Sequence, residues 1–179
     1  MKLLSIYSTD NSTAMFKFEQ DGDIFRPLEY WQSSAADRKV LSMCKTLSAD
    51  FEQGDYIVLN GLVREKEDTA WTNPLSERLS EYGVKHWYFV LQPSQLVVLM
   101  ASFELVQAKQ QLDTSSFEEW PKLQRMMESV DELPARSLAF LQGLSELKNP
   151  CKKSSFWGVE IYKPRGNDIV SQIQIFAGS

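Results

Sequence analysis

The chain of 179 residues carries a formal charge of −5, and 43% of its residues are hydrophobic and 24% charged. This length and composition are typical of one globular domain with a sizeable core, and they exclude a disordered chain. The acidic balance excludes a protein that coats nucleic acid through bulk electrostatics, although a local phosphate site stays open.

The apolar segments are too short for a signal peptide or a membrane span. The longest apolar run, Leu96 to Ala101, is far below the roughly 20 residues that cross a bilayer. Cys44, Cys151 and the single histidine, His86, have no zinc-site spacing. We predict that Cys44 is a buried thiol on a helix. We therefore expect a soluble, cytoplasmic α/β protein.

Hydrophobic periodicity predicts alternating strands and helices in the first part of the chain. The predicted strands are 3–8, 15–19, 56–59 and 87–91, with turns at 10–12 and 21–23. The predicted helices are 34–49, 74–82 and 93–112. Ser34 opens the first of these helices with capping-box spacing, and Pro74 suits the first turn of the second. This alternation predicts a mixed sheet with helices packed on it.

The second part of the chain predicts two helices and a β-hairpin. The helices are 115–130 and 135–148, and the hairpin strands are 156–162 and 169–176 around a turn at 164–167. We expect a core over residues 1–112. Residues 113–179 form a helical extension and a hairpin packed on that core, within one compact domain.

Two polar groups could hold phosphate. Lys39, Ser42 and Thr46 lie at i, i+3 and i+7, so they share one face of the predicted helix. Gly61 and Arg64 follow a buried strand, where a glycine permits close approach and an arginine offers a fork for phosphate oxygens. The alternatives are a solvated helix face and a turn with a surface arginine.

The order of these residues resembles the ParB/sulfiredoxin superfamily over roughly residues 23–102. The matching segments are Arg26–Leu28, Lys39–Thr46, Gly54–Tyr56, Gly61–Arg64 and Gly83–Leu96. The resemblance implies a ParB/sulfiredoxin-like α/β (mixed α+β) core. It also implies that Lys39, Ser42, Thr46, Gly61 and Arg64 bind ATP.

The catalytic cysteine of sulfiredoxins is absent, because Leu62 and Val63 stand where that family has cysteine and histidine. Sulfiredoxin activity needs that thiolate and is excluded. What remains resembles the plasmid fertility-inhibition factors of the superfamily. That resemblance implies an ATPase and DNase, with Arg64 and Lys39 as catalytic residues, that blocks DNA transfer through a conjugative type IV secretion system. It further implies as partners T-DNA or plasmid DNA in a relaxosome and a secretion coupling protein, which would recruit the chain to the inner membrane.

Further charged residues suggest a metal site and a DNA contact. Glu65 and Glu67 are candidate ligands for Mg²⁺, which prefers oxygen donors; the alternative is a solvated loop. The candidate DNA contacts are Lys152, Lys153, Lys163 and Arg165, around the hairpin. Their alternative is a solubilising rim on an edge hairpin.

Two other functions compete with the ATP-dependent nuclease. One is a non-catalytic inhibitor that binds a coupling protein or relaxosome through a retired enzyme fold. The other is a DNA-binding regulator without hydrolysis, whose affinity would depend on salt because phosphate contacts release counterions.

Overall fold

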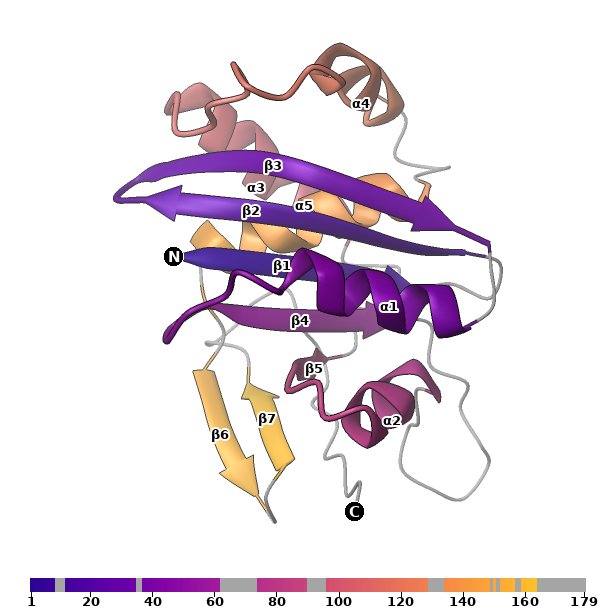
Figure 1. Cartoon of the computed structure of the whole chain (residues 1–179). Helices are drawn as coiled ribbons and strands as arrows, with labels where there is room; N and C mark the ends of the chain where they lie inside the picture. The colour runs from indigo at the N-terminus through magenta and orange to yellow at the C-terminus, as the bar shows by residue number, and fades with distance from the viewer. Residues whose placement is uncertain are drawn as a thin grey trace.

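A seven-stranded mixed sheet forms the centre of the computed structural model, with strand order β3-β2-β1-β4-β5-β7-β6 (Figure 1). The structure describes residues 1–8, 12–34, 37–61, 74–89, 96–128, 134–148, 150, 152–156 and 159–163. The strands are β1 (Lys2–Ser8), β2 (Thr13–Asp21), β3 (Ile24–Ser33), β4 (Tyr56–Gly61), β5 (Trp87–Phe89), β6 (Lys152–Phe156) and β7 (Val159–Lys163). The helices are α1 (Asp37–Leu47), α2 (Pro74–Glu81), α3 (Leu96–Ala108), α4 (Trp120–Met126) and α5 (Ala135–Lys148).

The centre of the sheet combines a meander with parallel strands. β2 runs antiparallel to both β1 and β3, whereas β4 pairs in parallel with β1 and with β5. β1 is buried on both faces, as its nearly continuous apolar sequence requires. The last pairs of β1 and β4 are Tyr7 with Asn60 and Ser8 with Gly61, so both strands end at the same edge of the sheet.

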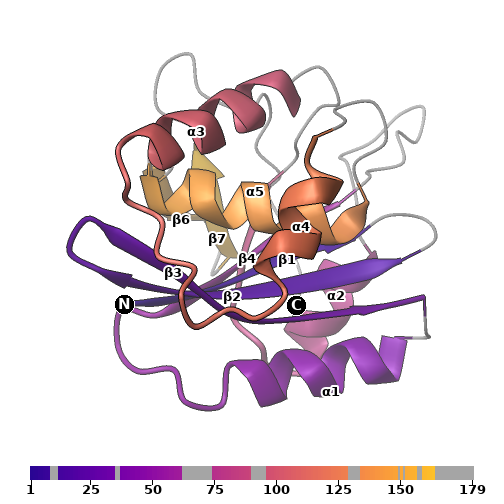
Figure 2. The same cartoon turned by 90° about the horizontal axis from the view of Figure 1, so that it is seen from above.

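Helices cover both faces of the sheet. Figure 2 shows α1 and α2 on one side and α3, α4 and α5 on the other. Each side has its own hydrophobic cluster, one built around Phe16, Phe18 and Phe140 and the other around Leu4, Ile6 and Leu79. This layering confirms the predicted mixed α/β class.

β3 is absent from the elements that the sequence predicts, which place Arg26, Pro27 and Leu28 in a motif ahead of a helix. β3 lies at one end of the strand order, and an edge strand tolerates a proline because one side of it needs no ladder hydrogen bond. The register between β2 and β3 shifts close to this proline, between Lys17 and Phe18. The proline therefore marks an edge strand.

Two helices are shorter than predicted. The predicted helix 93–112 is α3, and beyond its end Gln110 takes a positive φ of 54° while Leu112 forms a bridge to Phe25 of β3. Of the described residues in the predicted helix 115–130, only Trp120–Met126 are helical, and they form α4. Its predicted cap, Ser115, instead donates hydrogen bonds from its backbone nitrogen and hydroxyl to Asp113 at 3.1 and 2.6 Å. That local bonding replaces the first helical turn.

Other predictions are confirmed. α2 matches the predicted helix 74–82 to within one residue, and α5 matches 135–148. Cys44 is a free, buried thiol on α1, and burial raises its pKa to about 12. Among the described helices, none combines the length and the apolar character that a membrane crossing demands.

The hairpin lies at a different place from the predicted one. It is formed by β6 and β7, which pair antiparallel, so the predicted strand 156–162 contains residues of both strands. The alternating pattern runs through the whole predicted segment, and periodicity alone could not show where one strand ends and the next begins. The predicted turn at 164–167 and the predicted strand 169–176 lie outside the described residues, as does most of the predicted turn at 10–12.

Candidate functional site

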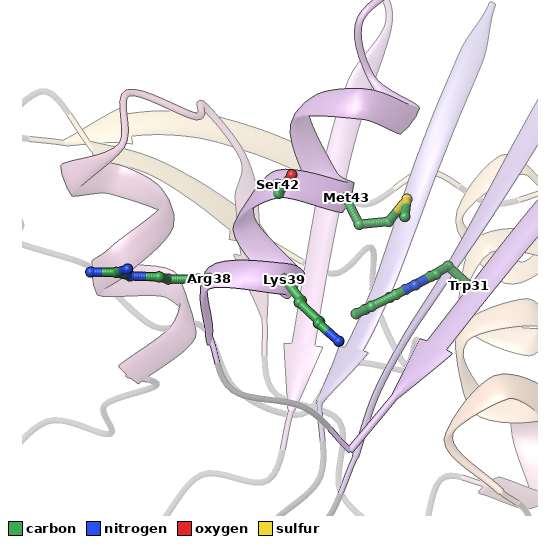
Figure 3. A pocket seen from close by; sticks show the side chains of 5 residues that line it. All are labelled: Trp31, Arg38, Lys39, Ser42 and Met43. Atoms are coloured by element: carbon green, nitrogen blue, oxygen red, sulfur yellow. The ribbon is translucent and has the colours of Figure 1, made fainter.

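A cavity of about 250 Å³ opens between β3 and α1 and is lined by Trp31, Arg38, Lys39, Ser42 and Met43 (Figure 3). Trp31 is held there by strand register, because it pairs with Met15, a residue of the cluster under α1. The side chains of Lys39 and Met43 extend toward the Trp31 ring, whereas Arg38 points away from it. An aromatic ring and a lysine therefore face the same hollow.

α1 presents its polar face here because its apolar residues are used in the core. Val40, Leu41, Cys44 and Leu47 are buried, and Arg38, Lys39 and Ser42 are exposed. This is the amphipathic division expected of a helix that covers a sheet. The helix thus fixes the position of the polar side chains without burying them.

The predicted phosphate-binding residues are brought together in part. Lys39 and Ser42 both line the cavity. Thr46 is exposed one turn further along, and its hydroxyl donates a hydrogen bond of 2.9 Å to the Ser42 carbonyl oxygen, so it serves the helix backbone. Gly61 ends β4 beside Ser8. Arg64, Glu65, Glu67 and Arg165 lie outside the described residues.

Three residues of the cavity are not among the site residues that the sequence predicts: Trp31, Arg38 and Met43. Trp31 is not predicted because β3, the strand that carries it, is not predicted. The available signal is the run of aromatic and β-forming residues after the Asp21–Asp23 turn, which continues through Trp31. A strand there would have placed an indole beside the polar face of the helix.

The hairpin carries three of the predicted DNA-contacting lysines on its two adjacent strands. Lys152 of β6 pairs in register with Lys163 of β7, and Lys153 pairs with Tyr162. The pair of Lys152 and Lys163 is the one furthest from the turn between the strands. The register therefore gathers three cationic residues at neighbouring positions, at the end of the hairpin away from its turn.

The shared end of β1 and β4 is the second place to look for a site, because ligands of open α/β sheets bind beyond the carboxyl ends of the strands. Tyr7 is buried there, and burial raises its pKa. Across the face, Gln142 of α5 donates hydrogen bonds of 3.1 Å to the Ser5 hydroxyl and to the Ile6 carbonyl oxygen. Within the described part of the chain, no group of three or more metal-binding side chains occurs.

Helix α5 contains buried polar atoms that lack partners in the described structure. These atoms are Arg136 Nε, Ser137 Oγ and Gln142 Oε1. Arg136 is otherwise engaged: its guanidinium lies 4.8 Å from the centre of the Tyr30 ring, and its Nη1 donates a 2.8 Å hydrogen bond to the Tyr30 hydroxyl. That hydroxyl donates in turn to the Glu119 carboxylate, which raises the pKa of Tyr30.

No protein-family profile and no curated protein matches the sequence. The structure is similar to the large terminase of a thermophilic bacteriophage, in two crystal forms. The TM-scores are 0.50 and 0.52 at 10% identity, covering 68% and 72% of this chain. The chain spans 30% of the length of each terminase chain. The large terminase nuclease of the thermophilic phage G20c aligns over 94% of this chain and 74% of its own, with a TM-score of 0.48 and 13% identity.

The predicted membership of the ParB/sulfiredoxin superfamily is wrong. The fold is instead similar to that of the first of these phage terminases. The matched segments are short, and their order along the chain does not determine the order of the strands in the sheet. Arg26–Leu28 lies within β3, and Lys39–Thr46 belongs to an amphipathic helix on the sheet. Short polar motifs on amphipathic elements recur across unrelated folds, and here they carried the assignment.

Proposed function

We propose that this protein is a Mg²⁺-dependent nuclease that cleaves DNA. The observation that carries the proposal is the likeness of the fold to that of a phage large terminase, with a TM-score of 0.52. Many nucleases use bound divalent metals. A metal held here would supply charge stabilisation at the phosphate and activation of the attacking water.

The metal ligands would come from the segments that follow β1 and β4. Asp10 comes two residues after the end of β1, and Glu65 and Glu67 come soon after the end of β4. Carboxylate oxygens are the ligands that Mg²⁺ prefers. Arg64 of the same segment is the proposed phosphate-binding cation, and the proposed DNA contacts of the hairpin are Lys152, Lys153, Lys163 and Arg165.

Incubation of the protein with single-stranded, duplex and branched DNA tests this proposal. With Mg²⁺ or Mn²⁺ we expect cleavage that EDTA abolishes. A Glu65→Gln, Glu67→Gln double variant should lose at least about 100-fold in rate, because both metal-binding charges are removed. The matched control is Glu104→Gln, which removes an exposed carboxylate on α3 that is distant in sequence from Glu65 and Glu67. Equal cleavage by the double variant and the wild type would reject these ligands.

A second candidate is a non-catalytic protein that binds DNA through a nuclease fold. It is favoured by the residues at the end of β1, because Tyr7 and Ser8 offer no carboxylate. DNA binding without cleavage in Mg²⁺ and in Mn²⁺ would support this candidate.

ATP hydrolysis and the inhibition of conjugative transfer were implied by the ParB/sulfiredoxin resemblance alone. With that resemblance removed, the support that remains for a phosphate-binding role of Lys39 and Ser42 is their shared cavity. The same loss of support applies to a secretion coupling protein as partner, which no described surface favours.

A further inference from the structure

The cavity between β3 and α1 combines two features that recognise a nucleotide. Trp31 supplies an indole ring, on which a nucleobase can stack. Lys39 extends toward that ring and supplies an ammonium group for a phosphate, and the Ser42 hydroxyl is a further hydrogen-bonding group. Met43 completes the wall with a polarizable thioether that adapts to flat ligands.

The charge distribution of α1 favours an anion at this place. Arg38 and Lys39 lie in the first turn of the helix, where the macrodipole is positive and cations are disfavoured. A phosphate bound beside Lys39 would offset the cost of that cation and would gain from the helix terminus. None of the five lining residues is acidic.

From this arrangement we infer that the cavity binds one nucleotide of a single-stranded DNA segment, with its base on Trp31 and its phosphate at Lys39. The inference rests on the proposed action on DNA and adds a strand-binding subsite on the α1 side of the sheet. The neutral hydrogen-bonding groups of the lining are the Ser42 hydroxyl and the Trp31 indole N–H, too few to read a base edge. Stacking of this kind is tolerant of sequence, as single-strand binding requires.

Fluorescence anisotropy with a labelled oligothymidylate in EDTA tests the subsite without cleavage. We expect Trp31→Ala to weaken binding about tenfold, since stacking on one base is worth that much, and Trp31→Phe to bind within about threefold of wild type. Lys39→Ala should weaken binding and reduce the slope of log K against log salt by about 0.7. Lys122→Ala, which removes an exposed lysine on α4, is the matched control and should change neither quantity.

Two further measurements distinguish a bound strand from a bound free nucleotide. Tryptophan fluorescence should be quenched by the oligonucleotide, and Trp31→Phe should lose that part of the quenching. Thymidine monophosphate and ATP are the competing probes. Saturation by either at concentrations that saturate the strand would assign the cavity to free nucleotides and overturn the strand-binding inference.

The outcomes also separate this inference from the proposed nuclease. Strand binding that depends on Trp31 and Lys39 without any cleavage would keep the subsite and reject the nuclease. Cleavage with unchanged strand affinity in both Trp31→Ala and Lys39→Ala would keep the nuclease and reject the subsite. Thermal unfolding of Trp31→Ala shows whether a loss of binding reflects a loss of folding, and Lys39→Ala, on an exposed position, decides the matter if it does.

Discussion

The two faces of the sheet are built differently. Under α5 the core is aromatic: the Phe140 ring lies 5.2 Å from Phe16 and 5.5 Å from Phe18, centre to centre. Under α1 and α2 the core is mostly aliphatic, and the buried Lys17 on the same sheet donates from its ammonium group to Asp50 at 2.8 Å. That ion pair, with a second from Lys2, lowers the pKa of Asp50. The core under α5 therefore packs mainly through aromatic rings, whereas the α1 side of the sheet includes a buried lysine paired with Asp50.

The helices differ in the same way. Almost every residue of α5 is buried, including Gln142 and Glu146, and Glu146 accepts a 2.8 Å hydrogen bond from the Tyr56 hydroxyl. α1 buries only its apolar stripe and leaves Lys39 exposed beside Trp31. α5 is therefore mainly a packing element, whereas α1 also leaves polar side chains exposed for a ligand. Substitutions on the two faces should separate these roles.

The largest effect is expected at Phe140. Replacing this fully buried ring by alanine should lower the free energy of unfolding by about 3–5 kcal/mol, since a cavity replaces contacts with several other rings. Phe140→Leu is the control and should cost clearly less because it keeps most of the volume. Chemical denaturation measures both. A cost below about 1 kcal/mol for Phe140→Ala would show that α5 does not anchor this face.

Sequence reasoning places the elements whose signals are local. α2 and α5 are predicted within a residue, because Pro74 begins the first and Pro134 directly precedes the second. β3 is missed because its proline resembles a break in a strand, and only its position at the sheet edge makes it acceptable. The predicted helix 115–130 begins too early, because Ser115 bonds to the nearby Asp113 instead of capping a helix.

Of the residues that line the candidate site, the sequence predicts only two, and both belong to α1. The spacing of Lys39 and Ser42 places them on one face, and they do share a cavity. Trp31 comes from a different element, and no periodicity in α1 could indicate which strand it faces. The family assignment fails for a related reason: the order of short motifs along the chain does not determine the order of the strands in the sheet.

Gly143 of α5 offers a second test of the tightly packed face. A Cβ at this position would meet Phe18 at Cε2 and, at 2.9 Å, at Cδ2, and Ser5 Cβ at 3.0 Å. Alanine would normally stabilise a helix interior, but overpacking of this kind costs about 1–3 kcal/mol. We expect Gly143→Ala to be destabilising, measured by thermal and chemical denaturation. Phe18→Leu in the same chain should recover part of the loss, and stabilisation by Gly143→Ala alone would contradict the close packing.

His86 gives the α2 side a pH dependence. Its Nδ1 donates to the Val84 carbonyl oxygen at 2.9 Å, and its Nε2 accepts from the Ser76 hydroxyl at 2.6 Å, so the neutral ring is held. Burial lowers its pKa below the ordinary value of 6.5.

The unfolded chain therefore binds a proton that the folded chain does not, and this contribution to stability is lost as the pH falls below about 6.5. The slope is at most about 1.4 kcal/mol per pH unit. Chemical denaturation of wild type and His86→Gln between about pH 7.5 and 5.5 measures it. An equal pH dependence in both would contradict the prediction.

The smallest effect, and the one that best separates the polar atoms within the α5 face, is expected from two serines. Ser137 is fully buried and its hydroxyl lacks a partner in the described structure, whereas Ser5 is equally buried and accepts a hydrogen bond from Gln142. Removing an unpaired buried hydroxyl should relieve a desolvation cost, so we expect Ser137→Ala to stabilise the protein by up to about 1 kcal/mol. Ser5→Ala leaves a buried amide short of an acceptor and should cost about 1 kcal/mol. Changes of opposite sign in the free energy of unfolding, measured with denaturant, would confirm that the Ser137 hydroxyl does not stabilise the fold. Destabilisation by both would contradict the prediction. It would mean that the Ser137 hydroxyl makes a stabilising hydrogen bond, as the Ser5 hydroxyl does with Gln142.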